Sequence, residues 1–200
     1  MSKVVVFMNL TLDGVMQAPG RPDEDRRGGF EHGGWAAPYN AMAQAGESMP
    51  TIGALLLGRR TYEDFYAVWP KRKGSPFSAL LDNMQKYVAS TTLSEPLAWI
   101  NSTLLKGDAA ETVARLKQES GTDLVIMGSG ELVQSLMRAN LIDEYVLLIH
   151  PLVLGSGRRL FPDGGAFAAL RLAGTRTTDN GVVIATYQPA EPAARKTTLT

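Results

Sequence analysis

The segment Ala54-Leu55-Leu56-Leu57-Gly58-Arg59-Arg60-Thr61 decides the fold. Its first four residues form an unbroken apolar run, which is typical of a strand that is covered on both faces. Gly58 then ends the strand, and the residues from Arg59 onward favour a helix with Thr61 as a cap or in its first turn. A buried strand that turns directly into a helix predicts a βα unit of a parallel sheet.

The same alternation of strand and helix continues on both sides of this segment. Further strands are predicted over 4–8, 86–90, 123–128 and 144–150, with a shorter one at Trp99-Ile100, and helices over 38–47, 76–84, 109–119 and after Gly130. Near the end, two strand-like runs flank Asp179-Asn180-Gly181, which is a strong hairpin signal. The predicted fold is therefore α/β, with a mixed, mostly parallel sheet flanked by helices and a C-terminal antiparallel hairpin. We expect one domain over 1–188 and a polar, disordered tail over 189–200.

The composition excludes several classes of function. The chain has 200 residues, with 20 lysines and arginines balancing 20 aspartates and glutamates, so a nucleic-acid-binding surface is a poor expectation. It has no cysteine and only two histidines, which argues against disulfides, thiolate catalysis and a zinc or other metal site. The apolar run at the N-terminus is too short for a signal peptide, and no run approaches the length of a membrane helix. We therefore expect a cytoplasmic protein with no membrane partner.

Two strand-to-helix turns are candidate phosphate sites, namely Gly58-Arg59-Arg60-Thr61 and Gly128-Ser129-Gly130-Glu131. At a helix N-terminus the backbone N–H groups lack intrahelical partners and the helix dipole favours an anion, so a phosphate fits there. Arg59 or Arg60 could add a charge-assisted contact. Each glycine could instead serve its turn alone, and Ser129 could simply cap its own helix. The second turn is also an incomplete G-x-G-x-x-G, because Val133 stands at the third glycine.

Other candidate residues follow the first and third strands. The hydroxyls of Ser90 and Thr91 could hold a ribose phosphate or belong to an ordinary loop. Asp13 could orient a substrate, although an Asp-Gly pair is also common in turns. Trp35 could stack on a ligand ring or fill the core. The polar, glycine-rich stretch 16–34 is predicted to be a long functional loop.

Taken together, these motifs resemble the dihydrofolate-reductase-like family, and more narrowly its bacterial branch related to the reductase domain of bifunctional riboflavin-biosynthesis proteins. The resemblance runs from about residue 3 to residue 188. It rests on the order and spacing of Thr11-Leu12-Asp13-Gly14-Val15, Gly28-Gly29-Phe30-Glu31-His32-Gly33-Gly34-Trp35, Leu57-Gly58-Arg59-Arg60-Thr61-Tyr62-Glu63, Trp69-Pro70, Met127-Gly128-Ser129-Gly130-Glu131-Leu132, Leu141-Ile142-Asp143-Glu144 and the segment 151–161.

The resemblance implies that NADPH lies across the strand ends of the sheet. It implies that Gly58, Arg59 and Thr61 contact the cofactor phosphates, that Ser90 and Thr91 lie near the adenosine end, and that the segment from Gly128 to Leu132 contacts the pyrophosphate. It also implies hydride transfer to a C=N or C=O carbon of a small heterocyclic or sugar-like substrate, and a homodimer.

Departures from the family pattern leave two questions open. Thr91 stands where family members often carry arginine, so the preference for NADPH over NADH is open. Asn40 stands in the region where dihydrofolate reductases have a carboxylate, and an amide cannot act as a general acid. The cysteine-dependent zinc deaminase half of the bifunctional protein is also missing.

Two main hypotheses follow. The first is a stand-alone NAD(P)H-dependent reductase in which Asp13 orients the substrate, Asn40 and Trp35 line the pocket, and the loop 16–34 closes over it. The second is a nucleotide-binding protein without turnover, and a third reading is a scaffold that has lost the cofactor as well. The assignment rests on the family motifs, because a fold by itself does not specify an activity.

Overall fold

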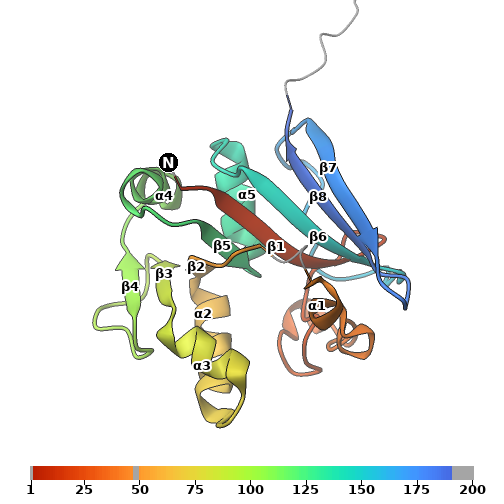
Figure 1. Cartoon of the computed structure of the whole chain (residues 1–200), viewed down its shortest axis with the longest axis horizontal. Coiled ribbons are helices and arrows are strands. Elements are labelled where there is room, and N and C mark those ends of the chain that lie inside the picture. The colour runs from red at the N-terminus through yellow and green to blue at the C-terminus, as the bar shows by residue number, and fades with distance from the viewer. Residues whose placement is uncertain (1, 47–49, 191–200) are drawn as a thin grey trace, which may run out of the picture.

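The computed structural model describes residues 2–46 and 50–190 and has one eight-stranded sheet at its centre (Figure 1). The strands lie in the order β4-β3-β2-β5-β1-β6-β8-β7. Their bounds are β1 Val4–Thr11, β2 Ala54–Gly58, β3 Gln85–Ala89, β4 Ser102–Leu105, β5 Leu124–Met127, β6 Glu144–His150, β7 Leu170–Thr177 and β8 Val183–Pro189. The first six strands pair in parallel, and β8 pairs antiparallel with both β6 and β7. The predicted mixed sheet with its terminal hairpin is confirmed.

Helices cover both faces of this sheet, as expected for crossovers between parallel strands. Their bounds are α1 Ala41–Gln44, α2 Arg59–Val68, α3 Pro76–Asn83, α4 Ala109–Glu119 and α5 Gly130–Arg138. Short 3-10 turns lie at Arg27–Gly29, Ala37–Tyr39 and Trp69–Lys71. Figure 1 shows α4 and α5 on one side of the sheet and α1, α2 and α3 on the other.

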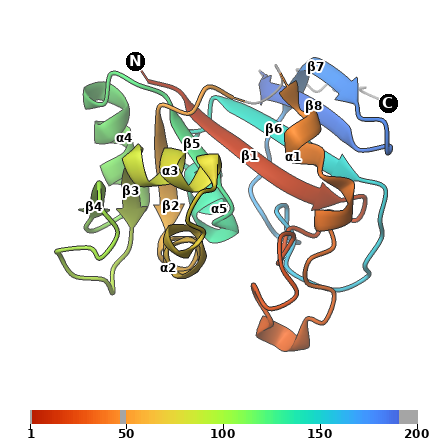
Figure 2. The same ribbon diagram turned by 60° about the horizontal axis from the view of Figure 1, so that its bottom comes forward.

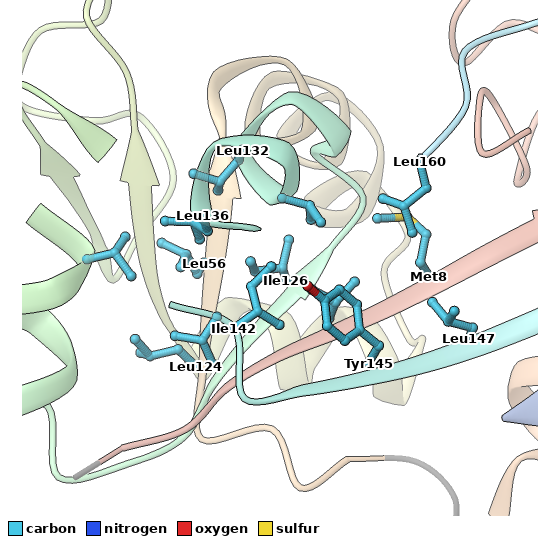
Figure 3. Close-up of a cluster of buried hydrophobic side chains, with 14 of the residues drawn as sticks. Met8, Leu56, Leu124, Ile126, Leu132, Leu136, Ile142, Tyr145, Leu147 and Leu160 are labelled. Carbon is cyan, nitrogen blue, oxygen red and sulfur yellow. The ribbon is translucent and has the colours of Figure 1, made fainter. Parts of the chain in front are cut away.

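Two cores result, one on each face of the sheet. Alternate β1 residues Val4, Val6 and Met8 pack with α4 and α5, and Figure 3 shows Leu132 and Leu136 of α5 against Leu56 and Ile126 of the sheet. Val5 and Phe7 point to the other face and pack with α1, α2 and α3. The central strands β2 and β5 are buried on both faces, which explains why their sequences are continuous apolar runs rather than alternating ones.

Three details of the predicted elements are wrong. The helix expected over 38–47 is a 3-10 turn followed by the four-residue α1, because Asn40 between them adopts a left-handed conformation with φ 45°; residues 47–49 lie outside the described residues. Trp99-Ile100 is not a strand, and β4 begins at Ser102 instead. Pro189 pairs with Leu170 and thus belongs to the hairpin rather than to the tail, whose residues 191–200 lie outside the described part.

Trp99 is missing from the sheet because it fills the core beneath α3. Its backbone N–H donates to Tyr62 Oη over 2.9 Å, and its indole Nε1 donates to Asp82 Oδ1 over 2.6 Å. The buried ammonium of Lys86 lies 4.6 Å from its ring centre and donates to the carbonyls of Leu81 and Met84, each at 2.7 Å. Lys86 thereby caps the C-terminal end of α3, where the helix dipole favours a cation.

Candidate active site

The two predicted phosphate turns lie side by side at the carboxyl ends of β2 and β5. The Ser129 hydroxyl accepts a hydrogen bond from the Gly58 backbone N–H over 2.8 Å and donates to Thr61 Oγ1, also over 2.8 Å. Gly128 makes this approach possible, because its φ is 77° and an added Cβ would lie 3.1 Å from the Thr61 methyl carbon. The Ser129 hydroxyl therefore connects the two predicted turns through hydrogen bonds to Gly58 and Thr61.

Both turns present free backbone donors. The N-cap residues of α2 and α5 are Gly58 and Ser129, and neither provides a side-chain cap, whereas Ser75 caps α3 and Asp108 caps α4. The alternative in which Ser129 caps its own helix is wrong, since its hydroxyl points across to the neighbouring turn. The first-turn N–H groups of both helices are thus available to an anion such as phosphate.

Arginines surround these two helix ends. Arg60 and Arg158 lie 3.2 and 2.9 Å from Glu131 Oε1, and Arg59 lies 3.0 Å from Glu63 Oε2. Three arginines against two glutamates leave one net positive charge. These pairs are exposed, so each contributes little stability and can be exchanged for a phosphate.

Ser90 lies next to this site, because it follows Ala89 of β3, which pairs with Gly58 of β2. Its hydroxyl accepts from the backbone N–H groups of Thr92 and Leu93, each over 3.1 Å, and so holds its own loop together. Thr91 is exposed. Their predicted contact with the adenosine end of a cofactor stays a prediction.

Asp13 fastens the loop that follows β6. Its carboxylate accepts from the Thr11 hydroxyl over 2.6 Å and from the backbone N–H groups of Leu154 and Gly155 over 3.2 and 2.9 Å. The hydrogen bond from Thr11 is the main cause that lowers the pKa of the Asp13 carboxyl. The hydrogen bonds from the backbone donors lower it further. Asp13 is therefore an ionised structural anchor, and its predicted role in orienting a substrate stays a prediction.

Trp35 lies in the small core under the loop 16–34 rather than on the surface. It is 8% exposed, its indole Nε1 donates to the Gln17 carbonyl over 2.7 Å, and it packs with Val15 and Phe30. The Trp35 ring also packs edge-on against the ring of His150 at the end of β6, with ring centres 5.1 Å apart. Whether it also lines a substrate pocket stays a prediction.

The loop 16–34, predicted to be long and functional, is attached both near its base and in its outer part. Near its start, the side chain of Gln17 is buried, and its Nε2 donates to the backbone carbonyls of Asp25 and Arg27. Its Oε1 accepts from the backbone N–H of Arg158. Further along, Arg21 donates to both carboxylate oxygens of Asp64 on α2. Figure 2 shows the loop beside the end of β1. The contact of Arg21 with Asp64 connects it to α2.

One polar residue at this edge, Asn9, escaped the predictions. Asn9 lies on β1 with its carboxamide oxygen 2.9 Å from Nε2 of the fully buried His150 at the end of β6. Burial lowers the pKa of His150 to about 4, so its ring is neutral at physiological pH. The available signal was the position of Asn9 in the alternation of β1, where it follows Val5 and Phe7 on the same face.

Across residues 2–46 and 50–190, no group of three or more histidine, aspartate or glutamate side chains is placed to hold a metal ion. No helix in that same part of the chain is long and apolar enough to cross a membrane.

The fold and the two joined turns define a dihydrofolate-reductase-like α/β protein. The model of the RibD C-terminal domain family matches residues 2–184, so the chain belongs to that family. Two uncharacterized Bacillus subtilis (strain 168) proteins are similar. YwjB is 32% identical over 181 residues, covering 87% of this chain and 91% of YwjB, and YyaP is 32% identical over 143 residues, covering 68% and 73%.

Solved structures share the fold at low sequence identity. A putative riboflavin biosynthesis protein from Shewanella sp. PV-4 has a TM-score of 0.64 at 20% identity, with 94% of this chain and 99% of that chain covered. Dihydrofolate reductase from Enterococcus faecalis, complexed with NADP(H) and RAB-propyl, has a TM-score of 0.58 at 16% identity, with 94% and 96% covered. The predicted family resemblance and fold class are thus confirmed.

Proposed function

We propose that this protein is an NAD(P)H-dependent reductase whose dinucleotide lies across the turns that follow β2 and β5. The observation that carries the proposal is the Ser129 bridge, which holds two uncapped helix N-termini together beside Arg59, Arg60 and Arg158. Two adjacent anion sites suit the two phosphates of a dinucleotide. Membership of the RibD C-terminal domain family supports the same assignment.

The roles of the residues follow from their positions. The N–H groups after Gly58 and Ser129 bind the pyrophosphate, with Gly130, Glu131 and Leu132 forming the first turn of α5. Arg59 and Arg60 neutralise phosphate charge, and Ser90 and Thr91 lie toward the adenosine end. Nicotinamide supplies the hydride when the cofactor is bound. We favour NADPH, because the Enterococcus faecalis dihydrofolate reductase that shares this fold is complexed with NADP(H).

The proposed substrate is a small heterocycle or sugar-like compound with a reducible C=N or C=O carbon. This resembles the reaction of 5-amino-6-(5-phosphoribosylamino)uracil reductase. In this proposal Trp35 and Asn40 line the substrate side, and the loop 16–34 excludes water. The proton comes from solvent, because Asp13 is fully engaged by donors of the protein and Asn40 carries no proton that it can give up.

The test is a fluorescence titration of the purified chain with NADPH and with NADH, repeated with Arg59→Ala. We expect NADPH to bind and Arg59→Ala to weaken that binding about tenfold, as for the loss of one charge-assisted hydrogen bond. Arg115→Ala is the matched control, since Arg115 is an exposed arginine of α4, away from both turns. No binding of either dinucleotide refutes the proposal.

A second candidate is a nucleotide-binding protein without turnover. The absence of a free carboxylate at Asp13 and the amide at Asn40 favour it. It predicts dinucleotide binding with no oxidation of NADPH by any pterin, aminopyrimidine or carbonyl compound, which an absorbance screen at the nicotinamide band measures.

The homodimer and the cytoplasmic location stay predictions, and light scattering of the purified chain tests the first.

A further inference from the structure

Asn9 occupies an open position in the sheet. It follows Val5 and Phe7 on one face of β1, and it is half-buried where they are buried. β5 ends at Met127, which pairs with Phe7, so Asn9 lies beyond the end of β5 and close to the turn that begins at Gly128. On its other side it pairs with Leu148 of β6. Its side chain therefore lies at the carboxyl edge, beside the proposed dinucleotide site.

His150 fixes the orientation of the Asn9 carboxamide. The His150 ring is fully buried, and the rings of Trp35 and Tyr39 pack edge-on against it with centres 5.1 Å away. A neutral imidazole has one N–H, and the Asn9 oxygen can only accept, so the proton lies on Nε2. His150 Nδ1 is then an acceptor, and it is buried with no hydrogen-bond partner among the described residues.

This arrangement leaves one donor unused at the end of β1. Asn9 Nδ2 points away from His150, and the described part of the chain offers it no acceptor. The other polar side chains there are occupied, since Thr11 donates to Asp13 and accepts from the Val15 N–H over 3.0 Å. Asn9 Nδ2 is not among the buried unpaired side-chain atoms, so it reaches the surface of this edge while His150 holds the oxygen of the same amide. The amide thus presents an oriented donor to an acceptor that a ligand brings.

We propose that Asn9 is a specificity-determining residue whose Nδ2 donates to a carbonyl oxygen on the planar ring bound at the carboxyl end of β1, and that His150 is its positioning residue. The inference rests on the proposed function, which supplies two planar rings, the nicotinamide and the ring of the hydride acceptor. The oxygen belongs to the nicotinamide carboxamide or to a ring carbonyl of the hydride acceptor.

The experiment compares two substitutions of Asn9 in two binding titrations. Asn9→Asp keeps the size and an acceptor for His150 but replaces the free donor with a carboxylate oxygen, whereas Asn9→Leu removes both polar atoms. The first titration uses NADPH, and the second uses 5,6-diaminouracil added to the NADP⁺ complex. We expect Asn9→Leu to weaken binding about 3- to 10-fold in one of them, as for the loss of one neutral hydrogen bond. Asn9→Asp weakens it further, because two acceptors then face each other.

The order of the two variants identifies the role of Asn9. A role in packing alone predicts the opposite order, with the isosteric aspartate closer to wild type than leucine. Loss of NADPH affinity assigns the oxygen to nicotinamide, and loss confined to 5,6-diaminouracil assigns it to the hydride acceptor. Unchanged affinities in both titrations overturn the inference and leave the reductase proposal intact. Wild-type protein that binds neither dinucleotide refutes the proposed function, and the inference falls with it.

His150 is tested by His150→Phe, which keeps an aromatic ring against Trp35 and Tyr39 but removes the N–H. We expect a loss of ligand affinity of about threefold from the unfastened amide. In the Asn9→Leu background the same change has no further effect on affinity, because no amide remains to be positioned. Additive losses in the double variant would show that His150 acts on the ligand site by another route and would overturn its assigned role.

Discussion

The Ser129 hydroxyl joins the two turns of the candidate site, so its removal has a calculable effect on stability. Ser129→Ala deletes two hydrogen bonds, the one from the Gly58 N–H and the one to Thr61 Oγ1. At about 1 kcal/mol each, the loss is about 2 kcal/mol, or a fall in melting temperature of about 4–8 °C for a chain of this size. Urea unfolding monitored by tryptophan fluorescence measures it.

Two further variants separate the hydroxyl from the backbone. Ser129 has φ 67°, a left-handed conformation that glycine adopts without strain, so Ser129→Gly recovers roughly 1 kcal/mol of the loss. Thr61→Val deletes only one of the two bonds and costs about 1 kcal/mol. Stability should therefore decrease from wild type to Thr61→Val and Ser129→Gly, and then to Ser129→Ala. A Ser129→Ala chain that unfolds at the wild-type urea concentration, or a glycine variant less stable than alanine, contradicts this reasoning.

Three other predictions concern charge and burial. Because burial lowers the folded-state pKa of His150 to about 4, stability is full above pH 6.5 and falls by roughly 3 kcal/mol as the pH decreases from 6.5 to 4; the fall should disappear in His150→Phe when urea midpoints are compared across that range. Desolvation likewise lowers the pKa of Lys86 to about 8, so the folded chain binds fewer protons than the unfolded chain between pH 8 and 10.5, and this group makes stability rise with pH there. Lys86→Met removes that rise and leaves the carbonyls of Leu81 and Met84 at the end of α3 without their donor, at a cost of about 1–3 kcal/mol in the same unfolding assay at pH 7. Asp13→Asn should destabilise the chain at pH 7, and the loss should shrink as the pH falls below the ordinary carboxyl pKa of 3.8, because a carboxyl with a lowered pKa stabilises the fold above its unfolded pKa and loses that contribution as it is protonated; a loss that stays constant as the pH falls would show that charge is not the cause.

The architecture could be predicted because its signals are local. A run such as Leu55-Leu56-Leu57 is buried on both faces, so hydrophobicity alone marks it as a central strand, and Asn180-Gly181 marks the hairpin by turn chemistry. Trp99 shows where this reasoning fails. An aromatic followed by isoleucine favours a strand, but the contacts with Tyr62 and Asp82, which come from distant parts of the sequence, hold Trp99 in a turn.

The site divides in the same way. Gly58 and Gly128 were predictable as strand-to-helix turns, whereas the hydroxyl bridge between those turns joins residues 71 positions apart and has no sequence signature. The contact between Asn9 and His150 spans 141 positions and depends on the register of β1 against β6. A polar residue in an apolar strand could have been noted, but its partner could not have been named.

The attachment of the loop 16–34 has a kinetic consequence. Gln17 and Trp35 hold its base by buried hydrogen bonds, whereas its outer part is held to α2 by Arg21 and Asp64, whose side chains are 24% and 23% exposed. Water and ions reach the second attachment and not the first. Added salt therefore weakens the contact with α2 selectively, and the loop detaches there while its base stays fixed. For the proposed reductase, a product release that requires this detachment would become faster with ionic strength, until weaker binding of the proposed dinucleotide's phosphates offsets the gain.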